Sequence, residues 1–159
     1  MKKLMLSTLI LILALPVWFL GDVPAVHAQE MTCPDHTAVR IDVKPGDRSN
    51  KINLSARGVL PVAVLTTRDF DARRFTPEMA HLSDADIAMD MGCAGAEAVH
   101  WKYADVNYDH RLDLVFYFRI QDLNLTPDST AATLMAHGTY GSTEIHILGT
   151  DSVHVKRWH

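Results

Sequence analysis

The amino-acid sequence predicts an all-β protein, an antiparallel β-sandwich of about seven or eight strands with immunoglobulin-like, Greek-key connections. The first observation is the alternation of polar and apolar residues in short segments, which is clearest over residues 112–120. The second is the regular spacing of turn-forming Gly, Pro and Asp residues between these segments. The third is that few stretches show the periodicity of an amphipathic helix.

The composition is that of one globular domain. The chain has 159 residues, of which 48% are hydrophobic and 21% are charged, and its formal net charge is −4. Its 15 Lys and Arg residues form no run longer than two, the length of the N-terminal pair Lys2 and Lys3. We therefore expect no nucleic-acid partner, because binding to a phosphate backbone requires a basic surface.

Residues 1–28 have the layout of a secretory signal peptide. A basic start precedes a nearly unbroken apolar run from Leu4 to Leu20, and Val26 and Ala28 occupy the small-residue positions of a cleavage site. The alternative is a retained membrane anchor, since the run approaches the roughly 18 residues that span a bilayer. We predict cleavage after Ala28, a secreted location (periplasmic or extracellular), and no stable membrane insertion afterwards.

Two cysteines, Cys33 and Cys93, follow the predicted cleavage site. An even number of cysteines in an oxidising compartment favours a disulfide bond. The bond would close a loop of about 60 residues and contribute about 4 kcal/mol in the chain-entropy model. It would tie an N-terminal segment, 29–39, to the β-sandwich domain predicted over 40–157. Two free thiols or half of a metal site are the alternatives.

The first predicted strands are short and separated by turns. Residues 40–44 alternate between polar and apolar and end at Pro45, and residues 52–54 form a second short strand. Residues 59–66 are rich in β-branched residues and apolar on both faces. They predict a central strand with Pro61 near its start.

The middle of the chain gives weaker signals. Thr76 as a cap and Pro77 in the first position predict one helical turn. The acidic, Gly- and Ala-rich stretch 83–98 predicts a long loop with at most a short strand, and residues 138–142 and 149–151 predict hairpin turns. The remaining predicted strands are 99–103, 112–120, 130–137, 143–148 and 152–156.

The candidate site lies between two predicted strands, in the nine residues from Asp105 to Asp113. Oxygen-bearing side chains occupy positions 1, 3, 5 and 9 of this segment, which are Asp105, Asn107, Asp109 and Asp113. The backbone carbonyl of Arg111 adds another oxygen, and Ca²⁺ takes about six to eight oxygen ligands. Oxygen donors favour Ca²⁺ over transition metals, and the large shell favours it over Mg²⁺. An ordinary acidic turn is the alternative.

This loop resembles the integrin-type (FG-GAP-like) calcium loop that closes a β-hairpin. Strand patterns flank it on both sides, and position 12 is Phe116, where a helix–loop–helix calcium site has Glu. Position 6, usually a glycine with positive φ, is His110. A non-glycine residue in that conformation costs about 1 kcal/mol, so we expect a distorted loop or a weaker affinity for calcium.

A wider resemblance covers Arg40 to Val155. The segments that carry it are Ile41–Gly46 (IDVKPG), Asn50–Leu54 (NKINL), Gly58–Thr67 (GVLPVAVLTT), Asp69–Ala72 (DFDA), the loop from Asp105 and the pair Gln121–Asp122. Together they resemble a β-domain common in secreted bacterial and archaeal proteins, where it is often appended to larger surface proteins. The resemblance implies a calcium-stabilised extracellular β-domain and implies no catalytic activity. The cysteine pair is not part of the shared pattern.

A few other side chains are candidates for function. Tyr108 at the loop tip and Asp122 after the following strand are candidate ligand-binding residues, with a turn role as the alternative for Asp122. His146 and His154 alternate with apolar residues and are expected to point outward, where neighbouring histidines on paired strands can chelate a metal. Ordinary exposed histidines are the alternative. Trp101 is expected in the core, with a role in stacking on a sugar as the alternative.

We therefore expect a secreted, calcium-binding β-sandwich module with a structural or binding role and no catalysis. The first alternative is a calcium-dependent carbohydrate- or surface-binding domain, whose partner is an extracellular protein or a glycan. The second alternative is a small metal-dependent hydrolase, for which the loop offers no evident base beyond His110.

Overall fold

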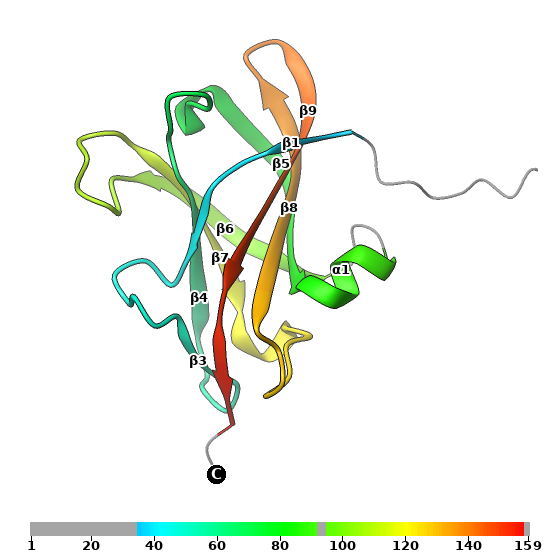
Figure 1. The fold of residues 1–159 in the computed structure, drawn as a ribbon. Helices are drawn as coiled ribbons and strands as arrows, with labels where there is room; N and C mark the ends of the chain where they lie inside the picture. Colours follow the sequence, from blue (N-terminus) through cyan, green and yellow to red (C-terminus); the bar gives the residue numbers. More distant parts are fainter. Residues whose placement is uncertain (1–34, 92–94, 158–159) are drawn as a thin grey trace, which may run out of the picture. The chain divides into compact units, whose positions relative to one another are not determined.

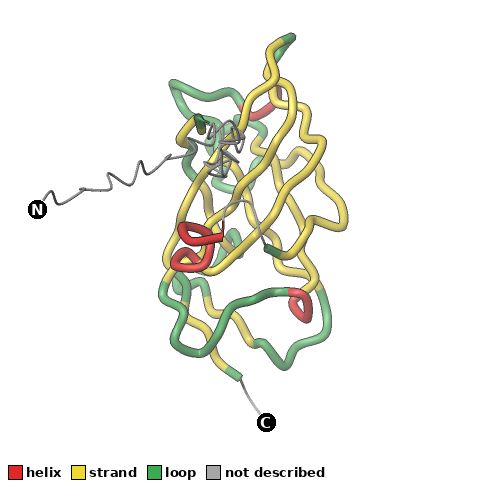
Figure 2. Tube along the Cα trace, turned by 90° about the vertical axis from the view of Figure 1, so that its right-hand side faces the viewer, coloured by secondary structure: helices red, strands yellow, loops and turns green. Residues whose placement is uncertain are grey.

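The computed structural model describes residues 35–91 and 95–157 of the chain. Strands make up most of this part (Figure 1, Figure 2). The strands are β1 (His36–Ala38), β2 (Ile41–Val43), β3 (Lys51–Asn53), β4 (Val59–Val64), β5 (Phe75–Asp84), β6 (Ala96–Ala104), β7 (Asp113–Arg119), β8 (Ala131–Tyr140), β9 (Thr143–Ser152) and β10 (His154–Lys156). Helix α1 spans Ala85–Met91, and the 3₁₀ turns η1 and η2 span Ala72–Arg74 and Ile120–Asp122. The predicted all-β class is confirmed.

Eight strands form one continuous sheet in the order β1-β9-β8-β5-β6-β7-β4-β2, and β10 pairs with β3 in a small second sheet. The sheet is mixed, because β1 runs parallel to β9 while the other neighbours are antiparallel. The predicted sandwich of two separate sheets is not confirmed. Strand β6 makes the sheet continuous, because its first residues, Ala96 and Glu97, pair with β5 and the residues from Ala98 onward pair with β7.

The sheet curls, and its two edge strands follow each other in the chain. Val39 and Arg40 connect β1 to β2, and the N–H of Val39 donates to the carbonyl oxygen of Leu148 on β9 at 2.9 Å. The N–H of Val43 on β2 donates to Oδ2 of Asp151, also on β9, at 2.9 Å. The edge strand β2 is thereby held against β9, which reduces the backbone that it offers to other chains.

Gly149 lies inside β9 and not in the turn predicted at 149–151. A Cβ atom here would lie 2.5 Å from Cγ2 of Ile41 and 2.8 Å from the carbonyl oxygen of Val39. Only glycine leaves room for the β1–β2 segment to cross β9 at this point, and a glycine within a strand often marks such a close approach. The turn prediction is wrong for this reason, and β9 continues to Ser152.

The core consists of apolar side chains that the curled sheet encloses. Val62, Ala63 and Val64 of β4 are all buried, as predicted for a central strand in 59–66. Each large apolar side chain that is fully buried contributes about 1.5–3 kcal/mol relative to exposure. The largest fully buried apolar side chains are Phe75, Phe116, Phe118, Leu82, Leu114, Leu134, Ile147 and Val43.

The middle of the chain is more regular than predicted. Residues 76–78 do not form a helical turn but belong to the ten-residue strand β5, because pairing with β8 outweighs the local helical signal. The register shifts between Pro77 and Met79, and this bulge accommodates the missing N–H of proline. The long loop predicted at 83–98 is wrong as well, because α1 and the start of β6 lie there.

Trp101 lies on the same face as Phe116, its partner in the ladder, but remains 40% exposed and does not join the core. Strands β5 and β6 pair at only two positions, Leu82 with Ala96 and His81 with Glu97. Beyond these positions the two strands separate, and the side chain of Trp101 lines a pocket between them. The prediction of a core position is therefore wrong for this residue.

Some predictions concern residues outside the described ranges. These are the signal peptide at 1–28 and the disulfide between Cys33 and Cys93. Among the residues that the structure describes, no helix is both long and apolar enough to cross a membrane. The predicted domain boundary at residue 40 falls within the sheet, because His36–Ala38 already form β1.

Candidate functional site

The predicted calcium loop connects β6 to β7 and projects beyond the ends of these strands (Figure 1). Oδ1 of Asp105 accepts the N–H of Asp109 at 3.2 Å, and its Oδ2 accepts the N–H of His110 at 3.0 Å. Oδ1 of Asn107 also accepts the N–H of Asp109, at 3.1 Å, and Oδ1 of Asp109 accepts the N–H of Arg111, at 2.9 Å. The backbone therefore winds around the first three predicted ligands.

Asp113, the fourth predicted side-chain ligand, is completely buried. Its Oδ1 accepts the N–H of Thr66 at 2.8 Å, and its Oδ2 accepts the N–H of Val106 at 3.1 Å. The bond from Thr66 attaches the loop to the segment that follows β4, and the bond from Val106 joins the two ends of the loop. Burial, and then the negative charges of Asp109 and Asp105, raise the pKa of Asp113 against the effect of its two backbone hydrogen bonds. The three carboxylates are therefore close enough to repel one another.

Two non-glycine residues of the loop have left-handed backbone conformations. The φ angle is 61° at Tyr108 and 65° at His110. Position 6 therefore has the positive φ that the sequence predicts there, although the residue is not glycine. Each such residue costs on the order of 1 kcal/mol. The hydrogen bonds from the backbone of Asp109 and His110 to Asp105 offset part of this cost.

The other predicted site residues are divided between two places. Arg111 lies in the loop, and the ring of Tyr108 at its tip is 86% exposed. Asp122 lies in η2, beyond the far end of β7, and a seven-residue strand of roughly 20 Å separates it from the loop. Asp122 therefore lies outside the loop, and its place in η2 agrees with the turn role that the sequence left open for it.

A second group of metal-ligating side chains lies on the outer face of β1, β9, β8 and β5. The strand register places His36 opposite His146, His146 opposite His137, and His137 opposite Met79. The ring centroids of His36 and His146 are 6.1 Å apart, and those of His137 and His146 are 4.7 Å apart. One row of four side chains therefore crosses four neighbouring strands.

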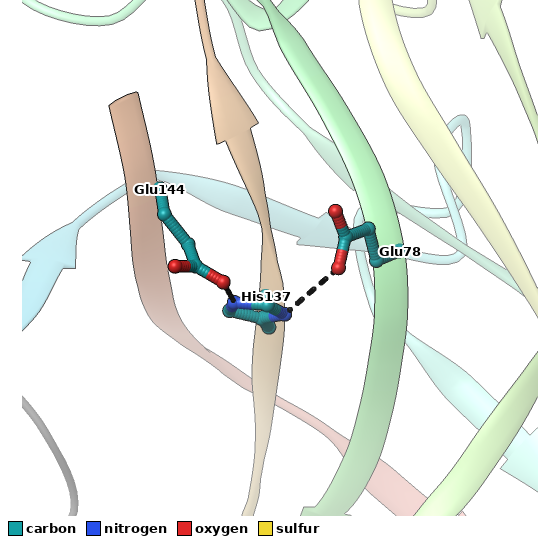
Figure 3. Close-up of side chains that lie close together, drawn as sticks. All are labelled: Glu78, His137 and Glu144. Atoms are coloured by element: carbon teal, nitrogen blue, oxygen red, sulfur yellow. Dashed lines mark hydrogen bonds and ion pairs between the residues drawn. The ribbon is translucent and has the colours of Figure 1, made fainter. Parts of the chain in front are cut away.

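His137 also lies between two carboxylates, as Figure 3 shows. Its Nε2 is 2.8 Å from Oε1 of Glu144 on β9, and its Nδ1 is 3.5 Å from Oε2 of Glu78 on β5. Glu78 sits at the bulge between Pro77 and Met79, a feature that often redirects a side chain. The ligand atoms of the three residues all lie within 4.8 Å of one another, a group that can hold a metal ion.

A pocket of about 220 Å³ adjoins this row and is lined by His36, Met79, His81, Met135, Ala136, His137 and His146. Nε2 of His36 and Nδ1 of His81 are buried without a hydrogen-bond partner, the only such side-chain atoms in residues 35–88 and 95–157. Burial, and then the positive charges of His137 and His36, lower the pKa of His146. The neutral imidazole is the form that binds metals.

The sequence did not predict this cluster, because the β8–β9 turn is shorter than its residues indicate. The turn consists of two residues, Gly141 and Ser142, and not of 138–142. A two-residue turn at this point pairs residues at equal distances from it, which places His137 opposite His146. His154, predicted as the neighbour of His146, instead pairs with Lys51 in the small second sheet.

Comparison with protein-family models, with curated proteins and with solved structures finds no match to the chain. The resemblance to calcium-binding β-domains therefore stays a prediction. The chemistry of the two sites has to come from their own donor atoms. These atoms are oxygens in the β6–β7 loop, and nitrogens, oxygens and sulfurs on the outer face of β1, β9, β8 and β5.

Proposed function

We propose that the protein is an exported β-module whose β6–β7 loop binds Ca²⁺, with a structural or binding role and no catalysis. The observation that carries the proposal is the winding of the loop around Asp105, which accepts the backbone N–H groups of Asp109 and His110. A carboxylate has about four lone-pair sites, so these bonds leave lone pairs for a cation. Export rests on the sequence of residues 1–28.

The charge of the loop supports a divalent cation. Asp105, Asp109 and Asp113 bring three carboxylates together, and Asn107 adds an amide oxygen. A bound Ca²⁺ would offset the repulsion between these carboxylates and the burial of Asp113. Mg²⁺ fits less well, because it requires a smaller octahedral shell and retains its water molecules.

Calcium binding would link three parts of the fold. The loop closes the β6–β7 hairpin, and Asp113 connects it to Thr66 after β4. Because an ion that binds only the folded state stabilises it by mass action, Ca²⁺ at 100 times its Kd would add about 2.7 kcal/mol to the free energy of unfolding.

Calorimetric titration of the protein with Ca²⁺, together with melting curves in EDTA and in Ca²⁺, tests the proposal. We expect one ion per chain, a Tm that falls in EDTA, and its recovery when Ca²⁺ is added back. Asp105→Asn and Asp109→Asn should each abolish the calcium-dependent shift. Asp128→Asn changes an exposed carboxylate before β8 and should retain it. Identical melting curves in EDTA and Ca²⁺ would refute the proposal.

A pocket beside the loop favours a second candidate, calcium-dependent binding of an acidic glycan. It is lined by Arg40, Leu65, Thr66, Thr67, Arg68, Asn107, Asp109 and Arg111. Guanidinium groups bind carboxylates in a bidentate manner, so three arginines suit a uronic acid. Three residues of the pocket, Asn107, Asp109 and Arg111, are also predicted calcium ligands, so a bound ion would shape it. The exposed ring of Tyr108 offers a surface for stacking on a sugar.

Binding of polygalacturonate in Ca²⁺ and in EDTA tests this second candidate. We expect calcium-dependent binding that Arg68→Ala weakens about tenfold, as loss of one charged contact implies. Arg48→Ala removes an exposed arginine outside the pocket and should bind like the unmodified protein. Equal binding of a neutral polysaccharide, or equal binding in EDTA, would count against an acidic-glycan site.

A further inference from the structure

We propose that the pocket on the outer face of β1, β9, β8 and β5 is a copper site, in which His36, His137 and His146 supply nitrogen ligands and Met79 supplies a thioether. The site uses residues that take no part in the β6–β7 loop. It therefore goes beyond the proposed calcium function and does not depend on it.

The spacing of each neighbouring pair of imidazoles fits a shared ion, and His36 and His137 have to turn toward His146 for all three to bind one ion. With metal–nitrogen bonds of about 2.0 Å, two imidazoles on one ion have ring centroids roughly 4.5–6.5 Å apart. The centroid separations are 4.7 Å between His137 and His146 and 6.1 Å between His36 and His146. His146 is central, because the strand register gives it one histidine on each side.

Glu144 orients the imidazole of His137 for binding a metal. Nε2 of His137 is 2.8 Å from Oε1 of Glu144, and this contact favours the neutral tautomer in which Nε2–H donates to the carboxylate and Nδ1 has a free lone pair. A carboxylate on the far nitrogen is the usual partner of a metal-bound histidine, and it fixes the tautomer and the ring orientation. Nδ1 has only a long contact of 3.5 Å to Oε2 of Glu78, which a metal can replace.

Two buried nitrogens without partners provide independent support. Nε2 of His36 and Nδ1 of His81 are inaccessible to solvent and accept or donate no hydrogen bond. Buried polar atoms in native proteins are nearly always paired, so such atoms require an explanation. Both residues line the same pocket, and a metal ion there would bind the nitrogen of His36 directly. His81 lies opposite Met135 in the next row of the sheet and offers a fourth imidazole nearby.

The donor set favours copper over the other biological metals. Thioether sulfur selects Cu(I), and imidazoles bind Cu(II) more tightly than they bind the other divalent first-row metals. Met79 and Met135 both line the pocket beside the histidines. Ca²⁺ and Mg²⁺ are unsuitable here because they prefer oxygen ligands. Zn²⁺ shares the preference for imidazole and gains nothing from a thioether, so the methionine distinguishes the two metals.

Titration of the protein with Cu(II), followed by electron paramagnetic resonance, tests the nitrogen ligands. We expect one Cu(II) per chain at micromolar concentration, with nitrogen hyperfine structure from three imidazoles. His146→Gln should weaken the affinity about 100-fold or more, since even outer-shell partners contribute 10–100-fold. His36→Gln, on the edge strand β1, should weaken the copper affinity as well. This variant replaces His146→Gln in the test if His146→Gln does not fold. Circular dichroism verifies the fold of each variant.

Histidines outside the pocket provide the matched controls. His100→Gln and His154→Gln remove exposed imidazoles on β6 and β10 and should leave the copper affinity unchanged. Asp105→Asn in the β6–β7 loop should leave it unchanged too. Copper affinity that survives both His146→Gln and His36→Gln would overturn the proposal. Loss of the affinity in Asp105→Asn would do so as well, because it would place the copper in the loop.

Met79→Leu tests the thioether with a side chain of similar size. Under reducing conditions we expect this variant to bind Cu(I) at least tenfold more weakly, while its affinity for Zn²⁺ stays that of the unmodified protein. Unchanged Cu(I) affinity would overturn the assignment of Met79. An equal loss for both metals would show a packing effect and would also overturn it.

Discussion

His137 on β8 lies directly opposite His146 on β9, with the centroids of the two rings 4.7 Å apart. Two imidazoles at this distance repel each other when both are protonated, and His36 on β1 adds a third ring beside His146. Within the described part of the chain, the negative charge of Glu144 acts in the opposite direction and raises the pKa of His146. The metal-free pocket therefore favours neutral His146, whose pKa is lowered by burial first and by its two histidine neighbours second.

The lowered pKa of His146 predicts that the metal-free protein loses stability as the pH falls through the histidine range. A histidine in the unfolded chain has a pKa of about 6.5, and that of folded His146 is lower. Between these two values the unfolded chain binds more protons, so the free energy of unfolding decreases as the pH falls. The decrease stops below the folded pKa. Urea unfolding between about pH 7.5 and 5, with a chelator to keep the protein free of metal, measures this decrease in the free energy of unfolding.

Removal of the imidazole should flatten this pH dependence. His146→Gln should lose part of the slope, because its amide does not titrate. His154→Gln removes an exposed histidine on β10 and should keep the slope of the unmodified protein. A His146→Gln variant with an unchanged slope would contradict the prediction.

Asp113→Asn should destabilise the protein even without calcium. The amide oxygen can accept one of the N–H groups of Thr66 and Val106, but the NH₂ group then faces the other. One buried donor loses its partner, at a cost of about 1–3 kcal/mol in the free energy of unfolding. Urea unfolding in EDTA measures this loss. Asp109→Asn, which is exposed, should change the stability in EDTA by about 0.5 kcal/mol at most.

Gly149→Ala should destabilise the protein through a clash with the backbone. The added methyl group would lie 2.8 Å from the carbonyl oxygen of Val39 and 2.5 Å from Cγ2 of Ile41, so the β1–β2 segment has to shift. Overpacking of this kind costs about 1–3 kcal/mol. Thermal unfolding compares the variant with Ser152→Ala, an exposed change in the same strand that should have little effect. Equal melting temperatures would disprove the predicted clash.

Asp151→Ala should loosen the contact between β2 and β9. Oδ2 of Asp151 accepts the N–H of Val43 at 2.9 Å and Nδ2 of Asn50 at 2.9 Å. Removal of the carboxylate leaves two donors without this partner, and we expect a loss of about 1–3 kcal/mol. The edge strand β2 also becomes available for pairing with other chains. Urea unfolding and size-exclusion chromatography measure the two effects, and Asp128→Ala, which should change neither, is the control.

The local features of the fold and of the loop could be predicted from the sequence. Apolar residues in 59–66 and 112–120 predict the central strands β4 and β7, because alternation and β-branching are properties of neighbouring residues. The donor positions from Asp105 to Asp113 and the positive φ at His110 belong to nine consecutive residues for the same reason. Weak local signals failed where pairing decided the outcome, as at 76–78, which became part of β5.

The sequence by itself therefore determined the all-β class, the central strands and the spacing of oxygen donors in one loop. The tertiary structure alone decided the histidine pocket, in which His36 of β1 and Met79 of β5 join His137 and His146 of the β8–β9 hairpin from distant parts of the chain. Their side chains meet only because the hairpin register and the bulge in β5 align these strands. The register of β1 on β9 and of β5 on β8 depends on pairing between distant segments, and no local pattern of residues encodes it.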